Sequence, residues 1–375
     1  MKRKNGFLLL ASLFLSLLFM TGSAQAEAKM YSEPQQLSEY LHKIDFADYR
    51  EDSRWETIEF AEAFGCSSVR NGNFYGRNFD FIYNDVPSFV VRVAAKEGRH
   101  ASIGVATHFG LREGKLLKGE YDKQLELIPN FTLDGINDAG VICSHNVVPI
   151  KAVEPVTGTN PAGKDLNMLF IPRFVLDNAS SADEAVELIK SRNIVGNLHN
   201  ECYLHIMIAD KDKTYVVEFI DNKVKAVEKK GNEQIMTNFN VNLPKYPDSS
   251  LGIERYAILQ KNYDMGNTFE GMFALMQKVK FSLAFRISTH PHWYTDKAIP
   301  LSVMNQPGFY KDYQKTYKEE CFAYWKARLN DKYRAEANGN YWLTVHNSTY
   351  DIEKKMFRVI AQERYKKTFE FYLEE

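Results

Sequence analysis

The chain has 375 residues, of which 45% are hydrophobic and 25% charged, and its formal net charge is -1. This near-neutral balance gives no reason to expect nucleic acid or an anionic membrane as a partner. The length allows one large domain or two small ones, and one domain is favoured because the sequence contains neither an internal repeat nor a convincing linker.

The N-terminus has the pattern of an export signal. A basic start at residues 2–4 precedes an apolar run at 7–20 that is too short to cross a bilayer comfortably, and Ala-Gln-Ala at 24–26 fits the small-x-small cleavage pattern. We therefore expect residues 1–26 to be a signal peptide and the protein to be periplasmic or secreted, without a stable membrane span. The alternative is a permanent membrane anchor.

Residues 27–65 are charged and helix-prone. Leu37, Tyr40 and Leu41 have the i, i+3, i+4 spacing of an apolar helix face. We expect this segment to be either the first helix of the domain or a pro-segment that ends before Cys66.

Beyond Cys66 the sequence predicts strands. Asn71-Gly72, a dipeptide favoured in tight hairpin turns, separates the first two strands. The strands predicted up to residue 150 lie at 66–71, 74–82, 88–95, 101–109 and 140–148. A helical pattern follows from Asp165 to Lys190, where Ser181 and Glu184 form a capping box.

Strands and helices then occur in separate runs. Strands are expected at 202–209, 214–220, 234–239, 341–348, 356–361 and 368–373, and helices at 253–263 and 268–279. This order predicts an α+β fold rather than a doubly wound parallel sheet. Many of the strands are apolar on both faces, so the sheets are expected to be covered on both sides, as in a layered α/β/β/α sandwich.

The four cysteines are isolated from one another, so a zinc site is not expected. Cys143 and Cys202 lie in apolar runs and are expected to be buried as small hydrophobic residues. Cys66 is the candidate nucleophile, and it has two possible bases. One is a distant histidine, as in papain-like enzymes, although the surrounding sequence does not match theirs. The other is its own α-amine, with a pKa of about 7.7–8.0, released if the bond after Gly65 is cut.

The motifs that follow Cys66 resemble those of one family. They are, in order, "GRNFD", "DGINDAGV", "SHNVVP", "MTNFN" and "IERYAIL". Together with Cys66 they resemble the choloylglycine hydrolase and penicillin V acylase family of N-terminal-nucleophile (Ntn) amidases, which has acid ceramidase-like and acyltransferase relatives. The resemblance implies a four-layer αββα Ntn-hydrolase sandwich, with residues 27–65 as the pro-segment and 66–375 as a single domain.

The resemblance also implies roles for six residues. Cys66 would be the nucleophile and, through its freed amine, the base. Arg77 would favour the thiolate, and Asp80 would orient the amine. The oxyanion donors would be the backbone N–H of Asn146 and the side-chain amide of Asn238.

Arg255 would complete the site near Asp80 and the thiol. Each assignment has a plainer alternative: Arg77 and Asp80 as a surface ion pair, Asn146 and Asn238 as turn or loop residues, and Arg255 on a solvated helix face. Asn240 competes with Asn238 as oxyanion donor.

The implied activity is that of an exported cysteine amidase. It would hydrolyse a small N-acyl amide through an acyl thioester, and no metal or organic cofactor is implied. The candidate substrates are N-acyl amino acids, fatty-acid amides, conjugated bile salts and penicillin V. The interval from Cys66 to Arg77 is shorter than in bile-salt hydrolases and no proline follows Asn238, which weakens a bile-salt assignment.

Two other activities remain open. One is an acyltransferase that uses an amine in place of water. The other is a non-catalytic exported binding protein with Cys66 unprocessed. A homo-oligomer is possible by analogy with relatives.

Overall fold

The structure is a computed structural model that describes residues 29–50, 64–81, 87–107, 125–149, 156–196, 202–242, 252–280 and 343–373. Tyr31–Glu375 forms one compact unit and Met1–Met30 another. The predicted signal peptide lies outside the described residues. Within the part of the chain that is described, no helix is long and apolar enough to cross a membrane.

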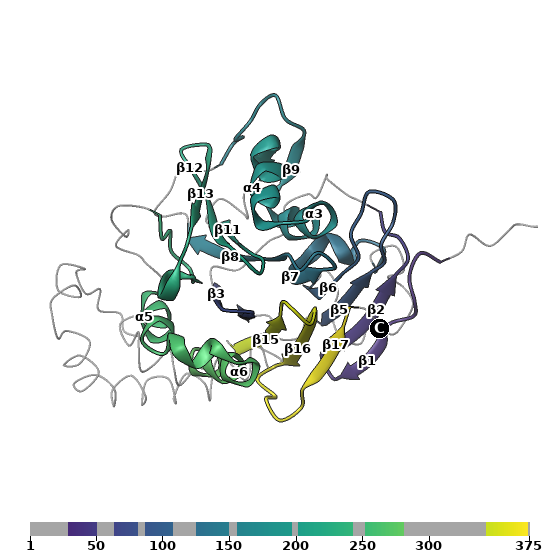
Figure 1. The fold of residues 1–375 in the computed structure, drawn as a ribbon. Coiled ribbons are helices and arrows are strands. Elements are labelled where there is room, and N and C mark those ends of the chain that lie inside the picture. The colour runs from purple at the N-terminus through teal and green to yellow at the C-terminus, as the bar shows by residue number, and fades with distance from the viewer. Residues whose placement is uncertain are drawn as a thin grey trace, which may run out of the picture. The chain divides into compact units, whose positions relative to one another are not determined.

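The larger unit contains a nine-stranded sheet (Figure 1). In spatial order its strands are β1 (Gln35–Ser38), β2 (Leu41–Phe46), β5 (Ser88–Val93), β6 (Ser102–Thr107), β7 (Thr132–Asn137), β8 (Ile142–Pro149), β11 (Cys202–Ala209), β12 (Thr214–Ile220) and β13 (Lys223–Glu228). Strands β2 and β5 pair in parallel, and the other pairs in this sheet are antiparallel.

A six-stranded antiparallel sheet faces it. Its strands, in spatial order, are β14 (Ile235–Met236), β3 (Phe64–Asn71), β4 (Phe74–Phe81), β15 (Leu343–Asp351), β16 (Met356–Ala361) and β17 (Phe369–Tyr372). Strand β3 packs against β8, and the hydroxyls of Tyr75 and Ser144 form a 2.5 Å hydrogen bond from one sheet to the other. Buried apolar residues fill the rest of the space between the sheets, among them Val105, Met207 and Phe357.

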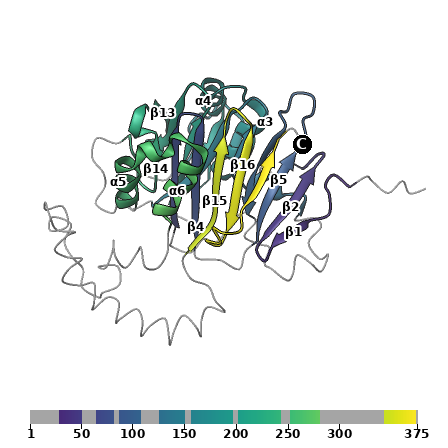
Figure 2. The same cartoon turned by 60° about the horizontal axis from the view of Figure 1, so that its bottom comes forward.

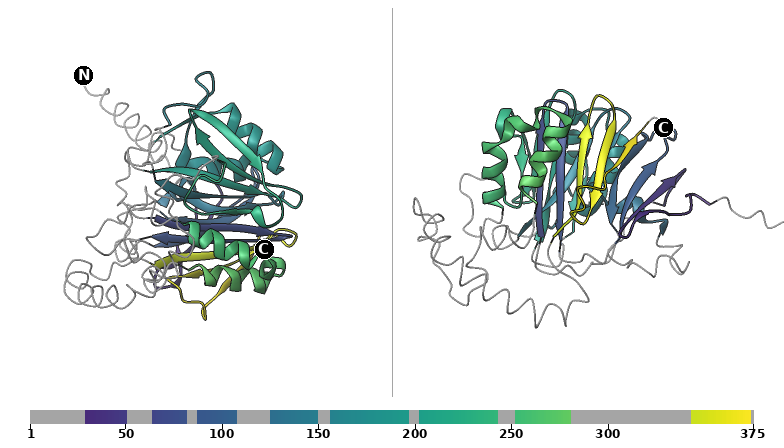
Figure 3. Two further views of the ribbon diagram at one scale, coloured as in Figure 1. Left: turned by 90° about the vertical axis from the view of Figure 1, so that its left-hand side faces the viewer. Right: turned by 90° about the horizontal axis from the view of Figure 1, so that it is seen from below.

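Two helix pairs cover the outer faces, which gives four layers (Figure 3). Helices α3 (Ile171–Asn178) and α4 (Ala182–Ser191) pack on the nine-stranded sheet, and α5 (Ile253–Lys261) and α6 (Phe269–Lys278) on the six-stranded sheet (Figure 2). A short parallel pair, β9 (Asp165–Asn167) with β10 (Asn193–Val195), flanks α3 and α4. The predicted α+β sandwich is therefore observed.

Two glycines let the helices approach the sheets. A Cβ at Gly76 would lie 2.6 Å from Met276 Cγ of α6, and one at Gly135 would lie 2.7 Å from Leu176 Cδ1 of α3. Both distances are shorter than van der Waals contact, so a side chain at either strand position would push its helix away.

The helix expected around Leu37, Tyr40 and Leu41 is wrong. Tyr31–Arg50 contains β1 and β2 and belongs to the compact unit. In β2 the residues Leu41, Ile44 and Phe46 are buried. The strand pairs with β1 on one side and with β5 on the other, and this pairing overrides the local helical spacing of residues 37–41. Residues 51–63 of the segment lie outside the described residues.

Other predicted elements are observed, with small shifts. The first hairpin turns at residues 72–73 rather than 71–72: Asn71 pairs with Phe74, and Gly72 has a positive φ of 57°. The helical pattern predicted from Asp165 to Lys190 differs more, because it begins with strand β9 and a short 3₁₀ helix and is then divided into α3 and α4. Strands β7, β9, β10 and β13 were not predicted. Ser181 caps α4 as expected, because its Oγ accepts the N–H of Glu184 at 3.2 Å.

Candidate active site

The first hairpin places three of the predicted residues. Cys66 lies on β3, and Arg77 and Asp80 lie on β4, all with at most 1% of their surface exposed. In the ladder Cys66 pairs with Phe79, and Gly65 pairs with Asp80. The bond between Gly65 and Cys66 therefore lies directly beside the end of β4 that carries Asp80.

The backbone of Cys66 is held by two of the distant residues. Its N–H donates to Oδ1 of Asn238 at 2.8 Å, and its carbonyl oxygen accepts from Nη1 of Arg255 at 2.5 Å. Arg255 Nη2 also donates to Asn238 Oδ1 at 2.6 Å, and Arg255 Nη1 donates to Ser67 Oγ at 3.0 Å. The structure thus brings Cys66, Asn238 and Arg255 into one hydrogen-bonded group.

The thiol of Cys66 is fully buried, and burial raises its pKa above the ordinary value. The charge of Arg77 acts in the opposite direction, while the carboxyl of Asp80 raises the pKa further. In the uncut chain the thiol is therefore held in its neutral form, so it needs a base before it can attack a carbonyl.

Asp80 is a buried carboxyl with an incomplete set of partners. Its Oδ1 accepts the hydroxyl of Thr344 at 2.6 Å, and its Oδ2 lies 3.5 Å from Arg255 Nη1. Among the described residues no hydrogen-bond donor reaches Oδ2. Burial raises the pKa of Asp80 to about 8, against the opposing effect of Arg255.

Arg77 sits in a network between the sheets. Its Nη1 forms a 3.0 Å ion pair with Asp134 Oδ2, and its Nη2 donates to the carbonyl oxygen of His145 at 2.8 Å. Asp134 also contacts His346 Nε2 at 2.9 Å and accepts the hydroxyl of Tyr350 at 2.5 Å. Arg77 therefore acts on Cys66 through its charge rather than through a hydrogen bond of the described set.

The two asparagines occupy different positions relative to Cys66. Asn146 Nδ2 donates to the carbonyl oxygens of Met236 and Thr237 at 3.1 and 3.2 Å, and Ser68 donates to its Oδ1. No hydrogen bond of the described residues joins Asn146 to Cys66.

Asn238, in contrast, contacts Cys66 directly and also donates its Nδ2 to the carbonyl oxygen of Val147 at 2.7 Å. The side-chain amide of Asn238 thus lies against the backbone carbonyl of Val147, the residue that follows Asn146.

Four residues of this group were not predicted. Ser67 adjoins Cys66 but gave no signal in the sequence. Asp134 lies inside the "DGINDAGV" motif, but the resemblance assigned it no role. Thr344 and His346 lie more than 260 positions after Asp80 and Arg77, and only the pairing of β15 with β4 brings them there.

Two further predictions concern the other cysteines and a metal site. Cys143 is a buried free thiol whose pKa is raised by burial, as expected for a small core residue. The side chain of Cys202 and all of Cys321 lie outside what the structure describes. Within the described residues there is no group of three or more metal-ligating side chains.

Comparison with known proteins gives one family. Residues 131–297 match the family model of acyl-coenzyme A:6-aminopenicillanic acid acyl-transferase. No curated protein matches the chain. The family match supports the predicted resemblance, through its acyltransferase branch.

Two solved structures of enzymes are similar to this chain. Conjugated bile acid hydrolase from Clostridium perfringens has 15% identity and a TM-score of 0.42, covering 82% of this chain and 93% of that one. Penicillin V acylase from Agrobacterium tumefaciens has 13% identity and a TM-score of 0.39, covering 84% and 87%. The assignment below rests on the family match and on the geometry of the site.

Proposed function

We propose that this protein is an exported cysteine amidase that acts on small N-acyl amides. One observation carries the proposal: the backbone nitrogen of Cys66 is held 2.8 Å from Asn238 Oδ1, beside a buried carboxyl, Asp80, with an unfilled oxygen. An amine released at this nitrogen would be next to its own thiol and would need no histidine.

The raised pKa of Asp80 supports the proposed cut between Gly65 and Cys66. In the uncut chain the backbone nitrogen is an amide and carries no charge, and the pKa of Asp80 is raised to about 8. Cleavage turns that nitrogen into an amine that becomes an ammonium on accepting a proton. Asp80 and the ammonium would then stabilise each other's charged forms.

Turnover would follow in two steps. The amine of Cys66 takes the thiol proton as sulfur attacks the amide carbonyl, and the leaving amine receives that proton as the acyl thioester forms. Water, deprotonated by the same amine, then releases the acid. The developing oxyanion would be stabilised by the side-chain amide of Asn238 and the backbone N–H of Asn146.

Arg77 and Arg255 would supply the positive charge around these steps. Arg255 holds the carbonyl of Cys66 and Oδ1 of Asn238, so it would fix the nucleophile relative to the oxyanion donor. Arg77 would favour the thiolate through its charge.

The substrate class is proposed from the resemblance. N-acyl amino acids and fatty-acid amides come first, and conjugated bile salts and penicillin V come second. Acyl transfer to an amine is the second candidate activity, and the matched family model, an acyl-transferase, favours it. Export is proposed from residues 1–26.

The test has two parts. Intact-mass measurement of the purified protein is expected to give a chain that begins at Cys66. Incubation with N-decanoylglycine, decanoyl p-nitroanilide, glycocholate and penicillin V is expected to release amine from at least one of them. The same assay with an added amine acceptor measures acyl transfer, because transfer would convert part of the acyl group into a new amide instead of the free acid.

The control is Cys66→Ala, which is expected to stay uncut and inactive. Full turnover by Cys66→Ala would exclude the mechanism. A fully uncut protein that binds these amides without turning them over would instead identify a binding protein. Loss of activity on changing one particular histidine, in a chain still joined to Gly65, would indicate a papain-like base.

A further inference from the structure

The residue before Asn238 is fixed from the nine-stranded sheet. His205 on β11 is fully buried, and its Nε2 lies 2.8 Å from the carbonyl oxygen of Thr237. Because a carbonyl oxygen only accepts, this nitrogen carries the proton. The same oxygen accepts from Asn146 Nδ2 at 3.2 Å. Two donors from one sheet thus hold the peptide that leads into Asn238.

The residues after Asn238 are fixed by the next strand. Glu218 on β12 is also fully buried, and its two oxygens accept the backbone N–H groups of Val241 at 2.7 Å and Asn242 at 3.1 Å. Glu218 Oε1 also lies 3.6 Å from His205 Nδ1. The two side chains therefore face each other and hold opposite ends of the same short segment.

We propose that His205 and Glu218 are positioning residues that fix Asn238 against Cys66. The inference rests on the proposed function, because it assigns them an effect on the oxyanion donor and on the nucleophile. Neither side chain contacts Cys66 in the described hydrogen bonds. They act through the backbone at Thr237 and Val241.

A small displacement of Asn238 is expected to have a large effect on the reaction rate. An oxyanion donor must lie about 2.7–3.1 Å from the developing charge, and a displacement of about 1 Å can cost about a hundredfold in rate. Asn238 belongs to a short segment between β14 and the region beyond residue 242, and its side chain has to reach both Cys66 and Val147. Anchors on both sides remove the freedom that such a segment would otherwise have.

The variants are chosen to keep size and change hydrogen bonding. Glu218→Gln has one acceptor oxygen in place of two, so one of the two backbone N–H groups loses its partner. His205→Gln keeps an N–H donor for the carbonyl of Thr237, while His205→Leu removes it. We expect kcat to fall about tenfold to a hundredfold in Glu218→Gln and His205→Leu, with KM within about threefold, and we expect His205→Gln to recover most of the loss.

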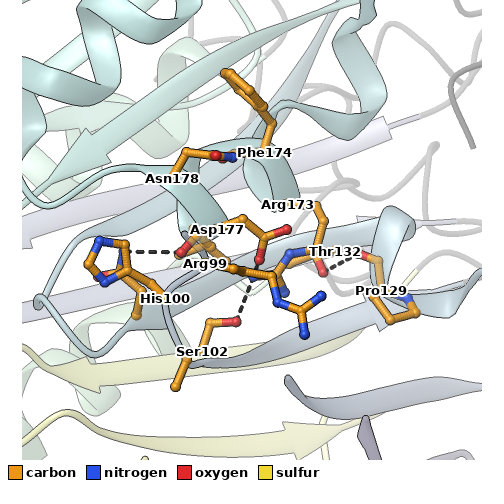
Figure 4. Close-up of polar contacts among 12 residues, drawn as sticks. Arg99, His100, Ser102, Pro129, Thr132, Arg173, Phe174, Asp177 and Asn178 are labelled. Atoms are coloured by element: carbon orange, nitrogen blue, oxygen red, sulfur yellow. Dashed lines mark hydrogen bonds and ion pairs between the residues drawn. The ribbon is translucent and has the colours of Figure 1, made fainter. Parts of the chain in front are cut away.

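The matched control is Asp177→Asn on α3. Asp177 is a buried carboxyl that accepts from Arg173 at 2.5 Å and from Tyr49, and Figure 4 shows it beside Arg173, which points to Ser102. This control also removes a buried carboxylate, but the described hydrogen bonds of its side chain do not reach Cys66 or the segment around Asn238. It is expected to lower the thermal midpoint as Glu218→Gln does and to leave kcat within about twofold.

A double-mutant cycle with Asn238→Ala decides between positioning and general destabilisation. If Glu218 acts through Asn238, kcat of Glu218→Gln/Asn238→Ala equals that of Asn238→Ala within about twofold. Multiplicative losses in kcat would overturn the inference, as would a kcat of Glu218→Gln equal to that of Asp177→Asn.

The His205 pair decides the matter if Glu218→Gln fails to fold: equal kcat in His205→Gln and His205→Leu overturns the inference. The assay uses whichever of decanoyl p-nitroanilide, N-decanoylglycine, glycocholate and penicillin V the wild type turns over. An uncut wild type that turns over none of them overturns the proposed function as well, whereas an active wild type with unaffected variants overturns only the positioning role.

Discussion

Two buried carboxyls, Asp80 and Asp134, differ in how completely they are paired. Each faces an arginine, and neither has exposed surface. Asp134 has partners at both oxygens, and the arginine and histidine beside it, with the Tyr350 hydroxyl, hold its pKa far below the ordinary range. Asp80 has one close hydrogen bond, to Thr344, and its pKa is raised to about 8.

The difference distinguishes a fully paired carboxylate from one with an oxygen that accepts no hydrogen bond among the described residues. Burial opposes ionisation at both positions, so the neighbouring charges, together with the hydrogen bonds, decide the outcome. A fully satisfied carboxylate such as Asp134 stabilises the fold and has nothing left to offer a substrate or an amine. Asp80 has an oxygen that accepts no hydrogen bond from the described residues, and the proposed function assigns this oxygen to the amine of Cys66.

The largest expected effect is the loss of stability when the charge of Asp134 is removed. Asp134→Asn leaves Arg77 as a buried cation without its counter-charge, so we expect unfolding free energy to fall by about 3–5 kcal/mol. Urea denaturation of the uncut Cys66→Ala chain measures it without interference from self-cleavage. Tyr350→Phe, which removes only one hydrogen bond, should cost about 1 kcal/mol. Equal losses in the two variants would contradict a dominant role for the charge.

The next prediction concerns catalysis at Asp80. Asp80→Asn removes the charge that would pair with the ammonium of Cys66, so we expect kcat to fall about a hundredfold, which corresponds to about 2.7 kcal/mol. In the uncut Cys66→Ala chain the unfolding free energy at pH 3 should stay within about 1 kcal/mol of the parent, because Asp80 is mostly protonated there in both the folded and the unfolded state. A large loss of stability with normal turnover would make Asp80 resemble Asp134.

The pH dependence of stability separates the two carboxyls further. The pKa of Asp80 rises from 3.8 to about 8 on folding. Between these values the folded state binds a proton that the unfolded state has lost, so the contribution of Asp80 to stability is complete below pH 4 and is lost as pH rises through 8. We expect Asp80→Asn, in the Cys66→Ala background, to become progressively stabilising relative to its parent from pH 4 to pH 8. Chemical denaturation at several pH values measures the difference, and a flat one would contradict the raised pKa.

The smallest expected effect is at Thr344. Thr344→Val removes the hydroxyl that Asp80 Oδ1 accepts, which disfavours the carboxylate, so we expect turnover at pH 7 to fall about threefold to tenfold. Thr349→Val is the matched control, since Thr349 is buried on the same strand and its hydroxyl has no hydrogen-bond partner among the described residues. It should leave turnover unchanged.

Local signals in the sequence predicted the local parts of this molecule. The hairpin between β3 and β4 follows from Asn71-Gly72, and the start of α4 follows from Ser181. The resemblance carried by the ordered motifs also singled out Cys66, Asn238 and Arg255, and in the structure these three residues form a hydrogen-bonded group.

Long-range pairing accounts for what the sequence missed. Residues 35–38 and 41–46 form strands because β2 pairs with β5, although Leu37, Tyr40 and Leu41 have helical spacing. Thr344 reaches Asp80, and Glu218 reaches Val241, only through the registers of sheets assembled from distant segments. No local pattern encodes these contacts. The backbone role predicted for Asn146 remains a prediction, since its described contacts are made by the side chain.

Strand β2 has a consequence for what a cut before Cys66 would produce. The chain ahead of that cut contributes β1 and β2 to the nine-stranded sheet, and Asp48 and Tyr49 bind Arg99 and Asp177 beyond it. Scission would therefore liberate an amine without liberating a peptide. The mature molecule would migrate as two fragments under denaturing conditions and elute as one particle in native buffer.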